Sequence, residues 1–187
     1  MAVGKKGEKT KRKIFVTAMK LFKEKGYDNV TVDEIAKGTF YIYFRTKAHI
    51  VAEVFTELDI NYEKSMKKVE FLGSSVEKVK KLLNDAIEIQ RDYVGYDLST
   101  IGYRAQLELH IEYSMDEERP LYQYTAKLIR EGQMRGEFNK DNTPEYYTKI
   151  LIRSIRGAIY EWCVSYNNYD FVEDGKKYIE NLLKILK

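Results

Sequence analysis

Residues 14–37 read IFVTAMKLFKEKGYDNVTVDEIAK, and residues 38–51 continue as GTFYIYFRTKAHIV. Apolar residues in the first part recur at intervals of three and four, the spacing that places them on one face of an α-helix. This apolar stripe consists of Ile14, Phe15, Ala18, Leu21 and Phe22. Gly26 follows the stripe and can end the helix in a left-handed conformation. The stretch therefore begins with an amphipathic helix.

A second, short helix is predicted over residues 31–37. Thr31 is followed three positions later by Glu34, a pairing that forms the capping box found at the start of many helices. The apolar residues Val32, Ile35 and Ala36 are expected to face the first helix. The capping box and the apolar residues agree on where this helix begins and which side it buries.

The third segment holds a pair of phenylalanines, Phe40 and Phe44, which lie four residues apart and so share one helical face. Their burial leaves Thr39, Tyr41 and Tyr43 pointing outward. Exposed tyrosines among basic residues suit contacts with the phosphates and some bases of a nucleic acid. The alternative interpretation is that these tyrosines are half-buried packing residues. The basic neighbours are Lys37, Arg45 and Lys47.

Composition favours an all-α fold. The 187 residues include two prolines and eleven glycines, and 33% are charged. Apolar residues keep the helical spacing almost throughout the chain. Residues 1–9 show no such spacing and are expected to form a disordered basic arm. Further helices are predicted at about 48–66, 76–95, 98–113, 116–136, 144–167 and 171–186.

Several classes of protein are excluded by what the sequence lacks. Cys163 is the single cysteine and cannot form a disulfide within the chain, and the two histidines have no partners at metal-ligand spacing, so we expect no metal and no cofactor. His110 with Glu108 and Glu112 lacks a positioned partner for acid–base chemistry, and no catalytic residue or enzymatic activity is predicted. No apolar stretch approaches the roughly 20 residues of a membrane span, so we expect a cytoplasmic protein.

Charge is divided unevenly along the chain. Residues 1–47 hold twelve Lys and Arg against five Asp and Glu, a net charge of +7, whereas residues 48–187 hold twenty against twenty-four, a net charge of −4. A basic head on a mildly acidic body suits binding to a polyanion, because each phosphate that is neutralised releases condensed counterions. The alternative is a solvated, lysine-rich start to the chain.

The two quoted strings resemble the N-terminal segment of TetR-family repressors, which has an amphipathic first helix, a T-V-x-x-I-A second helix and a third, recognition helix written G-T-x-Y-x-[YH]-F. The resemblance covers about a quarter of the chain. It implies a helix-turn-helix DNA-binding domain at 10–50 and a ligand-binding and dimerisation domain at 51–187. The DNA-binding residues that it implies are Thr31, Lys37, Gly38, Thr39, Tyr41, Tyr43 and Lys47.

One departure from the family pattern concerns the turn. Family members have about six residues between the second helix and G-T-x-Y, whereas here Lys37 runs directly into Gly38. Either the numbering closes over residues that were not observed, or the chain truly lacks them. We favour the first interpretation, because every flanking residue still fits the motif. If the two residues are joined directly, we expect the second and third helices to be fused or distorted and the DNA-binding assignment to fall.

The resemblance weakens in the body, where EGQMRGEF at 131–138 and GAIYEW at 157–162 match the family only in style. The family's last two helices usually form a homodimer interface, and the helices at 144–167 and 171–186 each bear a long apolar stripe. The predicted interface residues are Ile155, Ile159, Trp162, Ile179, Leu182, Leu183 and Leu186.

Eleven of the sixteen tyrosines lie between residues 93 and 169. Aromatic rings with polar tips suit a pocket that orients a small ligand, although each tyrosine could equally be a core or interface residue. The predicted pocket residues are Tyr96, Tyr103, His110, Tyr113, Tyr122 and Trp162.

The sequence therefore predicts a regulator, most simply a repressor that a small-molecule effector releases from operator DNA. The helix at 48–66 is expected to be the only segment continuous with both the head and the body. The alternative is a helical ligand-binding or interaction protein without DNA activity. The sequence does not identify the effector, the operator, or the direction of regulation.

Overall fold

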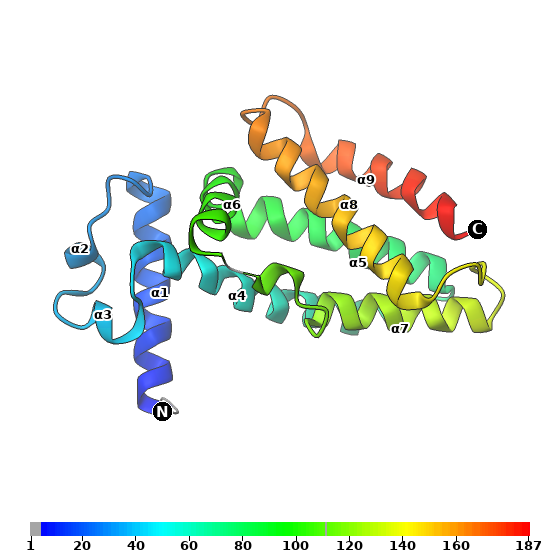
Figure 1. The fold of residues 1–187 in the computed structure, drawn as a ribbon, viewed down its shortest axis with the longest axis horizontal. Coiled ribbons are helices and arrows are strands. Elements are labelled where there is room, and N and C mark those ends of the chain that lie inside the picture. Colours follow the sequence, from blue (N-terminus) through cyan, green and yellow to red (C-terminus); the bar gives the residue numbers. More distant parts are fainter. Residues whose placement is uncertain (1–4, 111) are drawn as a thin grey trace. The chain divides into compact units, whose positions relative to one another are not determined.

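The computed structural model describes residues 5–110 and 112–187, and within these ranges the chain contains helices and no strand (Figure 1). The predicted all-α fold is confirmed. The α-helices are α1 (Lys5–Lys25), α2 (Val32–Ala36), α3 (Phe40–Tyr43), α4 (Lys47–Val69), α5 (Ser75–Ile89), α6 (Tyr96–Leu109), α7 (Pro120–Met134), α8 (Pro144–Val164) and α9 (Phe171–Leu182). A π-helical turn, η1 (Gln90–Val94), and two 3-10 turns, η2 (Tyr113–Met115) and η3 (Leu183–Leu186), complete the set.

The chain divides into two compact units. Among the described residues, unit 1 comprises residues 5–54 and 101–110, and unit 2 comprises residues 55–100 and 112–187. The sequence places a boundary after residue 50 and does not predict that residues 101–110 return to unit 1. Helices α4 and α6 each have residues in both units. The expectation that a single helix is continuous with both parts is therefore wrong.

Helix α1 begins at Lys5, earlier than the sequence predicts. Residues 5–9 are helical and do not form the expected disordered arm, while residues 1–4 of that arm lie outside the described residues. Lysine and glutamate have high helix propensity, and Glu8 in the first turn complements the positive end of the helix dipole. A helix that is already held by its packed half extends easily into such residues. At the other end Gly26 has φ +81°, the predicted left-handed cap.

The core of unit 1 forms between α1 and the short elements that follow it. Four of the five predicted stripe residues of α1 are buried, while Leu21 is half-buried. Burial of each large apolar side chain stabilises the fold by about 1.5–3 kcal/mol. The buried residues up to the start of α4 are Ile14, Phe15, Ala18, Phe22, Val30, Ile35, Phe40, Phe44 and Ile50.

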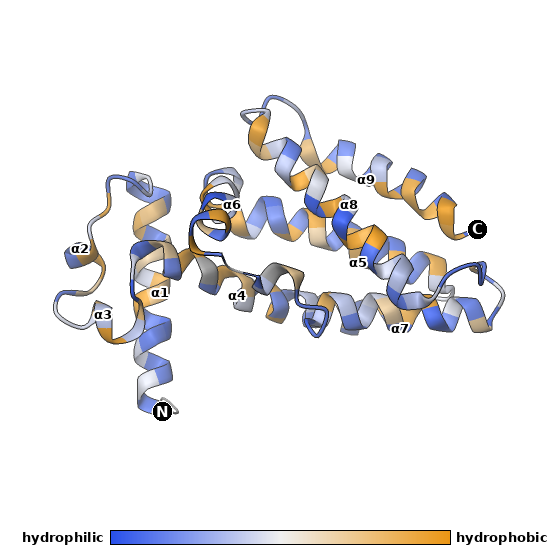
Figure 2. Cartoon of the chain, viewed as in Figure 1, coloured by the Kyte–Doolittle hydropathy of each residue, from blue (hydrophilic) through white to orange (hydrophobic). Residues whose placement is uncertain are grey.

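Unit 2 is organised around α5, which packs against α7, α8 and α9. Its capping box, Ser74 with Glu77, starts the helix. Helix α5 then presents a continuous buried face of Val79, Leu82, Leu83, Ala86 and Ile87. Figure 2 shows hydrophobic and hydrophilic residues interspersed along the helices. Among the described residues, no helix is long and apolar enough to cross a membrane.

The stretch EGQMRGEF, residues 131–138 at the end of α7, contacts the start of α5. A Cβ atom at Gly132 would lie 2.2 Å from the ring of Phe138, so glycine alone allows the ring to pack there. The neighbouring Glu137 carboxylate accepts hydrogen bonds from the backbone N–H groups of Ser75 (2.5 Å) and Val76 (3.2 Å). These bonds satisfy donors at the N-terminus of α5 that have no partner within the helix.

The apolar stripes of α8 and α9 face inward, toward the core of the same chain. Trp162 stacks on Phe171 with 4.4 Å between ring centroids. Of the predicted dimer-interface residues, only Leu182 is more than marginally accessible, and it is half-buried. The other six are core residues and are not available to contact a second copy: Ile155, Ile159, Trp162, Ile179, Leu183 and Leu186.

A buried ion pair ties α4 to the start of α7 in unit 2. The Arg119 guanidinium donates to the Asp59 carboxylate from Nη2 at 2.8 Å and from Nε at 3.2 Å, and the two side chains are 9% and 12% exposed. Tyr113 donates its hydroxyl hydrogen to the same carboxylate at 2.9 Å. The guanidinium carbon also lies 4.8 Å from the centroid of the Tyr113 ring. The charges are thus satisfied by one another and by an aromatic hydroxyl.

We predict that the two partners of this ion pair are energetically coupled. Arg119→Met or Asp59→Asn alone is expected to lower the free energy of unfolding by about 3–5 kcal/mol, because each leaves a buried charged or polar group unpaired. The double variant should lose less than the sum. Urea unfolding measures all three, with the exposed pair Glu173–Lys177 as a control that should cost little. Strictly additive losses would contradict the coupling.

Candidate nucleic-acid interface

The connection between α2 and α3 is a β-turn of four residues, Ala36 to Thr39. Lys37 has φ −55° and ψ 120°, and Gly38 has φ +77°, which are the dihedral angles of a type II turn. The Thr39 N–H donates to the Ala36 carbonyl at 3.4 Å. The third position of this turn requires positive φ, which glycine adopts without steric cost.

Lys37 and Gly38 are consecutive in the full 187-residue sequence, so the interpretation that residues are missing between them is wrong, and the two residues occupy the centre of one turn. Helices α2 and α3 are separate and therefore not fused, but α3 is shortened, which agrees with the distortion expected of a direct junction. The difference from the expected motif lies in α3, which spans only Phe40–Tyr43. Residues that the longer pattern would place at the start of the third helix are absent, so the turn occupies Lys37, Gly38 and Thr39.

Helix α2 has the capping box that the sequence predicts. The Glu34 N–H donates to the Thr31 hydroxyl at 3.3 Å, and the Thr31 N–H donates to the Glu34 carboxylate at 2.8 Å. The Lys25 ammonium also donates to this carboxylate at 2.7 Å. The hydrogen bond from Lys25, followed by those from Thr31, lowers the pKa of Glu34 to about 2. Thr31 thus fixes the start of α2 with both its backbone and its hydroxyl.

Helix α3 buries one side and exposes the other. Phe40 and Phe44 are buried as predicted, and Thr39 and Tyr41 are exposed as predicted. Tyr43 is half-buried, and Ile42, which the sequence analysis does not single out, is 72% exposed, as is Tyr41. The prediction of alternating outward residues neglects the 100° step of a helix, which turns Tyr43 back toward the buried side. Applying that step to the two phenylalanines would have identified Ile42.

Lys47 at the start of α4 has a structural role in unit 1. Its ammonium donates to the backbone carbonyls of Tyr27 at 2.6 Å and Val30 at 2.9 Å, and lies 4.2 Å from the centroid of the Tyr27 ring. These contacts hold the loop between α1 and α2 against α4. The exposed basic side chains near α3 are instead those of Lys37 and Arg45.

The residues predicted for a ligand pocket are divided between the two units. Tyr103 and His110 belong to unit 1, and the other four belong to unit 2. Tyr96 and Trp162 do make an edge-to-face contact at 5.6 Å, and the Tyr96 hydroxyl donates to the Cys163 carbonyl at 2.9 Å. The remaining two tyrosines have separate partners: Tyr113 bonds Asp59, and Tyr122 accepts from Arg156.

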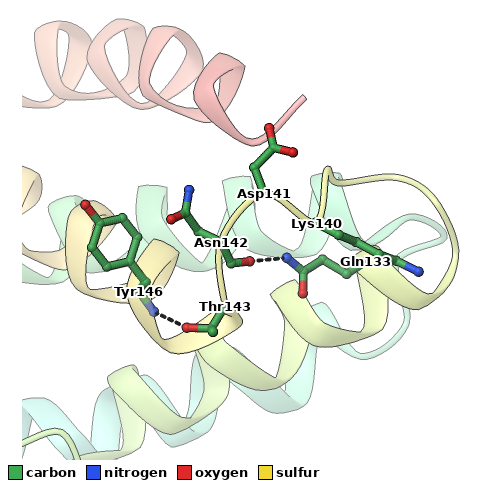
Figure 3. Close-up of a pocket in the computed structure, with 6 residues that line it drawn as sticks. All are labelled: Gln133, Lys140, Asp141, Asn142, Thr143 and Tyr146. Carbon is green, nitrogen blue, oxygen red and sulfur yellow. Dashed lines mark hydrogen bonds between the residues drawn. The ribbon is translucent and has the colours of Figure 1, made fainter.

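An open hollow of about 540 Å³ lies at the junction of α7 and α8 (Figure 3). Its polar groups bond one another: Gln133 donates to the Asn142 carbonyl at 2.9 Å, and the Tyr146 N–H donates to the Thr143 hydroxyl at 3.2 Å. None of the predicted pocket residues lines it. These bonds order the loop before α8, and we assign the hollow no ligand.

No group of three or more metal-ligating side chains occurs among the residues that the structure describes. Cys163 is buried, and burial raises the pKa of its thiol. Around α3 the exposed basic and aromatic side chains are those of Lys37, Tyr41 and Arg45.

Comparison with known proteins identifies relatives of both the head and the whole fold. The sequence model of bacterial regulatory proteins of the tetR family matches residues 14–54. The uncharacterised HTH-type transcriptional regulator YuxN of Bacillus subtilis is 38% identical over 68 residues, which are 33% of this chain. The match spans 22% of the length of YuxN, so it concerns one part of that protein.

Solved structures resemble the chain over nearly its full length. A TetR-family transcriptional regulator from Pectobacterium atrosepticum has a TM-score of 0.75 and 17% identity, covering 96% of this chain and 94% of its own. The regulator FadR from Bacillus subtilis, solved in complex with stearoyl-CoA, has a TM-score of 0.67 and 17% identity, covering 94% and 99%. At these identities the likeness establishes the fold.

We predict that the stability of unit 1 depends on the backbone of Gly38. No atom lies within 4 Å of a Cβ at this position, so Gly38→Ala should cost only conformational strain, about 1–2 kcal/mol of unfolding free energy. Gly38→Asn should cost less, because asparagine tolerates positive φ. Gly102→Ala is the control: it lies within a helix in the same unit, with ordinary contact to Val51, and should stabilise by about 0.5–1 kcal/mol. Thermal unfolding that ranks Ala above Asn at position 38 would contradict the turn.

Proposed function

Because residues 14–54 match the sequence model of bacterial regulatory proteins of the tetR family, we propose that the chain is a DNA-binding transcriptional repressor which a small-molecule effector releases from its operator. The observation that supports this proposal most directly is the surface of α3. This helix follows a tight turn, is anchored by the buried Phe40 and Phe44, and exposes Tyr41 and Ile42 close in sequence to the exposed Lys37 and Arg45. The major groove of DNA admits a helix of this kind.

Within the proposed interface the residues divide by role. Lys37, Thr39 and Tyr41 are exposed, and their ammonium, hydroxyl and phenol groups are suited to phosphate oxygens and base edges. Gly38 brings the backbone of the turn close to the same surface. Tyr43 is half-buried and can present its hydroxyl at the edge of the interface.

Two other residues that the sequence assigns to DNA contact act by positioning. Thr31 caps α2 through its hydroxyl, and Lys47 holds the loop before α2 through two backbone carbonyls. Neither role requires that the side chain reach DNA. We therefore assign the long-range electrostatic attraction to Lys37 and Arg45, together with the exposed lysines of α1, Lys6, Lys9 and Lys13.

We further propose that the protein binds DNA as a homodimer through the outer faces of α8 and α9. Exposed apolar side chains on these helices are Tyr160, Val164 and Tyr178, and Ile185 is exposed on the η3 turn that follows α9. A head that reads one half-site needs a partner head about 34–36 Å away, or a multiple of that distance, to read the other. A two-fold dimer supplies such a partner.

The effector is proposed to bind unit 2 and to act on unit 1 through the helices that the two units share. Helices α4 and α6 both continue from one unit into the other, so a displacement in unit 2 reaches unit 1 along two covalent paths. A differential affinity of about 1–3 kcal/mol between the two states is sufficient. By linkage, such an effector must bind the DNA complex more weakly by the same factor by which it weakens DNA binding.

A helical binding protein without DNA activity is the alternative function. The match of the family model to residues 14–54 disfavours it, because that match covers the helix-turn-helix itself. No enzymatic activity is proposed for either function.

We predict that DNA affinity falls steeply with salt and that individual cations account for the slope. In a plot of log affinity against log salt concentration, Lys37→Ala and Arg45→Ala should each reduce the steepness of the slope by about one, because each removes one phosphate contact. Lys47→Ala should destabilise unit 1 and leave the slope unchanged. Electrophoretic shift assays with operator selected from a random pool measure the slopes.

The control for this experiment is Lys177→Ala on the exposed side of α9, which should change neither the affinity nor the slope. Affinity that is independent of salt in the wild-type protein would contradict the DNA-binding function. If Lys47→Ala instead reduced the steepness of the slope by about one, Lys47 would be identified as a phosphate contact.

We predict that Tyr160→Glu combined with Val164→Glu yields a monomer at micromolar concentration in sedimentation velocity, because two charges would be buried in the proposed interface. Both residues are exposed in the single chain, so its fold should be retained. Ile60→Glu, at an exposed apolar position of α4, is the matched control and should remain dimeric. A dimer that survives the double substitution would locate the interface elsewhere.

A further inference from the structure

Ile42 occupies the outermost position of α3. Successive helical residues are about 100° apart, so the direction opposite the buried pair Phe40 and Phe44 is that of residue 42. The structure agrees with this geometry, since the two phenylalanines are almost fully buried and the Ile42 side chain is 72% exposed. An aliphatic side chain thus stands at the point of α3 that is farthest from the core of unit 1.

A single exposed isoleucine is ordinary on a protein surface and needs no explanation by itself. The position of Ile42 is what gives it meaning. Ile42 lies on α3, the helix that is proposed to enter the major groove of DNA. Its neighbour Tyr41 is equally exposed, and the exposed cations Lys37 and Arg45 precede and follow it in the sequence. Contacts of these neighbours with DNA would hold the Ile42 side chain close to the bases.

The chemistry of isoleucine restricts what it can recognise there. Its side chain has no donor or acceptor, so it gains nothing from a phosphate or from the polar edge of a base. The apolar group that the major groove presents is the C5-methyl of thymine. Tyr41, by contrast, can contact phosphate or base with its phenol, so its presence does not specify a base.

We propose that Ile42 is a specificity-determining residue, which selects thymine at one position of each half-site by apolar contact with the C5-methyl group. The inference rests on the proposed DNA-binding function and adds to it the identity of one base. Because α3 is only four residues long, few side chains can read bases. Loss of a single methyl contact should therefore change the affinity for the operator by a measurable factor.

The test uses full-length protein and the operator selected from a random DNA pool. Each thymine of a half-site is replaced in turn by deoxyuridine, which removes the C5-methyl group and leaves the base-pairing edge intact. The wild-type protein should lose about fourfold in affinity at one thymine, the value of one buried methyl group. Replacement of any other thymine should change the affinity very little.

The Ile42→Ala variant should bind the thymine and deoxyuridine operators equally at that position. Ile42→Val, which keeps a branched apolar side chain, should retain a reduced preference for thymine. Val16→Ala is the matched control, since Val16 is an exposed apolar residue of α1 in the same unit, and it should keep the full fourfold difference. Circular dichroism checks that all three variants remain folded, which their exposed positions favour.

The outcomes separate the two levels of the proposal. A wild-type protein that selects no DNA sequence overturns the proposed function, and this inference with it. A protein that selects an operator but shows no deoxyuridine effect overturns the inference alone. The same holds if Ile42→Ala keeps the fourfold preference for thymine, because another residue then makes the contact.

Discussion

The surface of unit 1 depends on one backbone constraint, the left-handed conformation of Gly38. This residue reverses the chain between α2 and α3 within four residues, where related proteins are expected to use a longer turn. The reversal leads directly into α3, where Phe40 and Phe44 are buried in the core of unit 1, and their burial fixes the direction of the other α3 side chains. A residue with a Cβ would meet no obstacle there, so the requirement is conformational and not one of space.

Further contacts hold the elements around this turn in place. The capping box of Thr31 and Glu34 fixes where α2 begins, and the ammonium of Lys47 bonds the loop that leads into it. The short α3 has little stability of its own, because an isolated helix of four residues cannot repay the cost of nucleation. It persists because its two aromatic anchors are packed and because its neighbours are tied to the core of unit 1.

Unit 2 uses polar groups to fix the ends of its helices. Glu137 caps α5 from a loop more than sixty residues away, and the pair Asp59 and Arg119 connects α4 to the start of α7. Asp59 and Arg119 are buried and Glu137 is half-buried, and all three have partners. The outer faces of α8 and α9 expose apolar side chains, among them Val164 and Tyr178. The proposed homodimer would use this exposed surface and leave the polar contacts of the interior unchanged.

The sequence by itself determined the helices of the head, the capping box and the burial of Phe40 and Phe44, because helix signals are local and depend on spacings of three and four residues. It did not determine what each buried face packs against. The apolar stripe containing Trp162 was predicted to meet a second chain and instead packs within its own, since periodicity identifies a buried side but not its partner. Tertiary structure also turned Lys47 toward carbonyls that lie seventeen and twenty residues earlier. Only the folded chain brings those groups together, because contacts between distant segments leave no mark in local spacing.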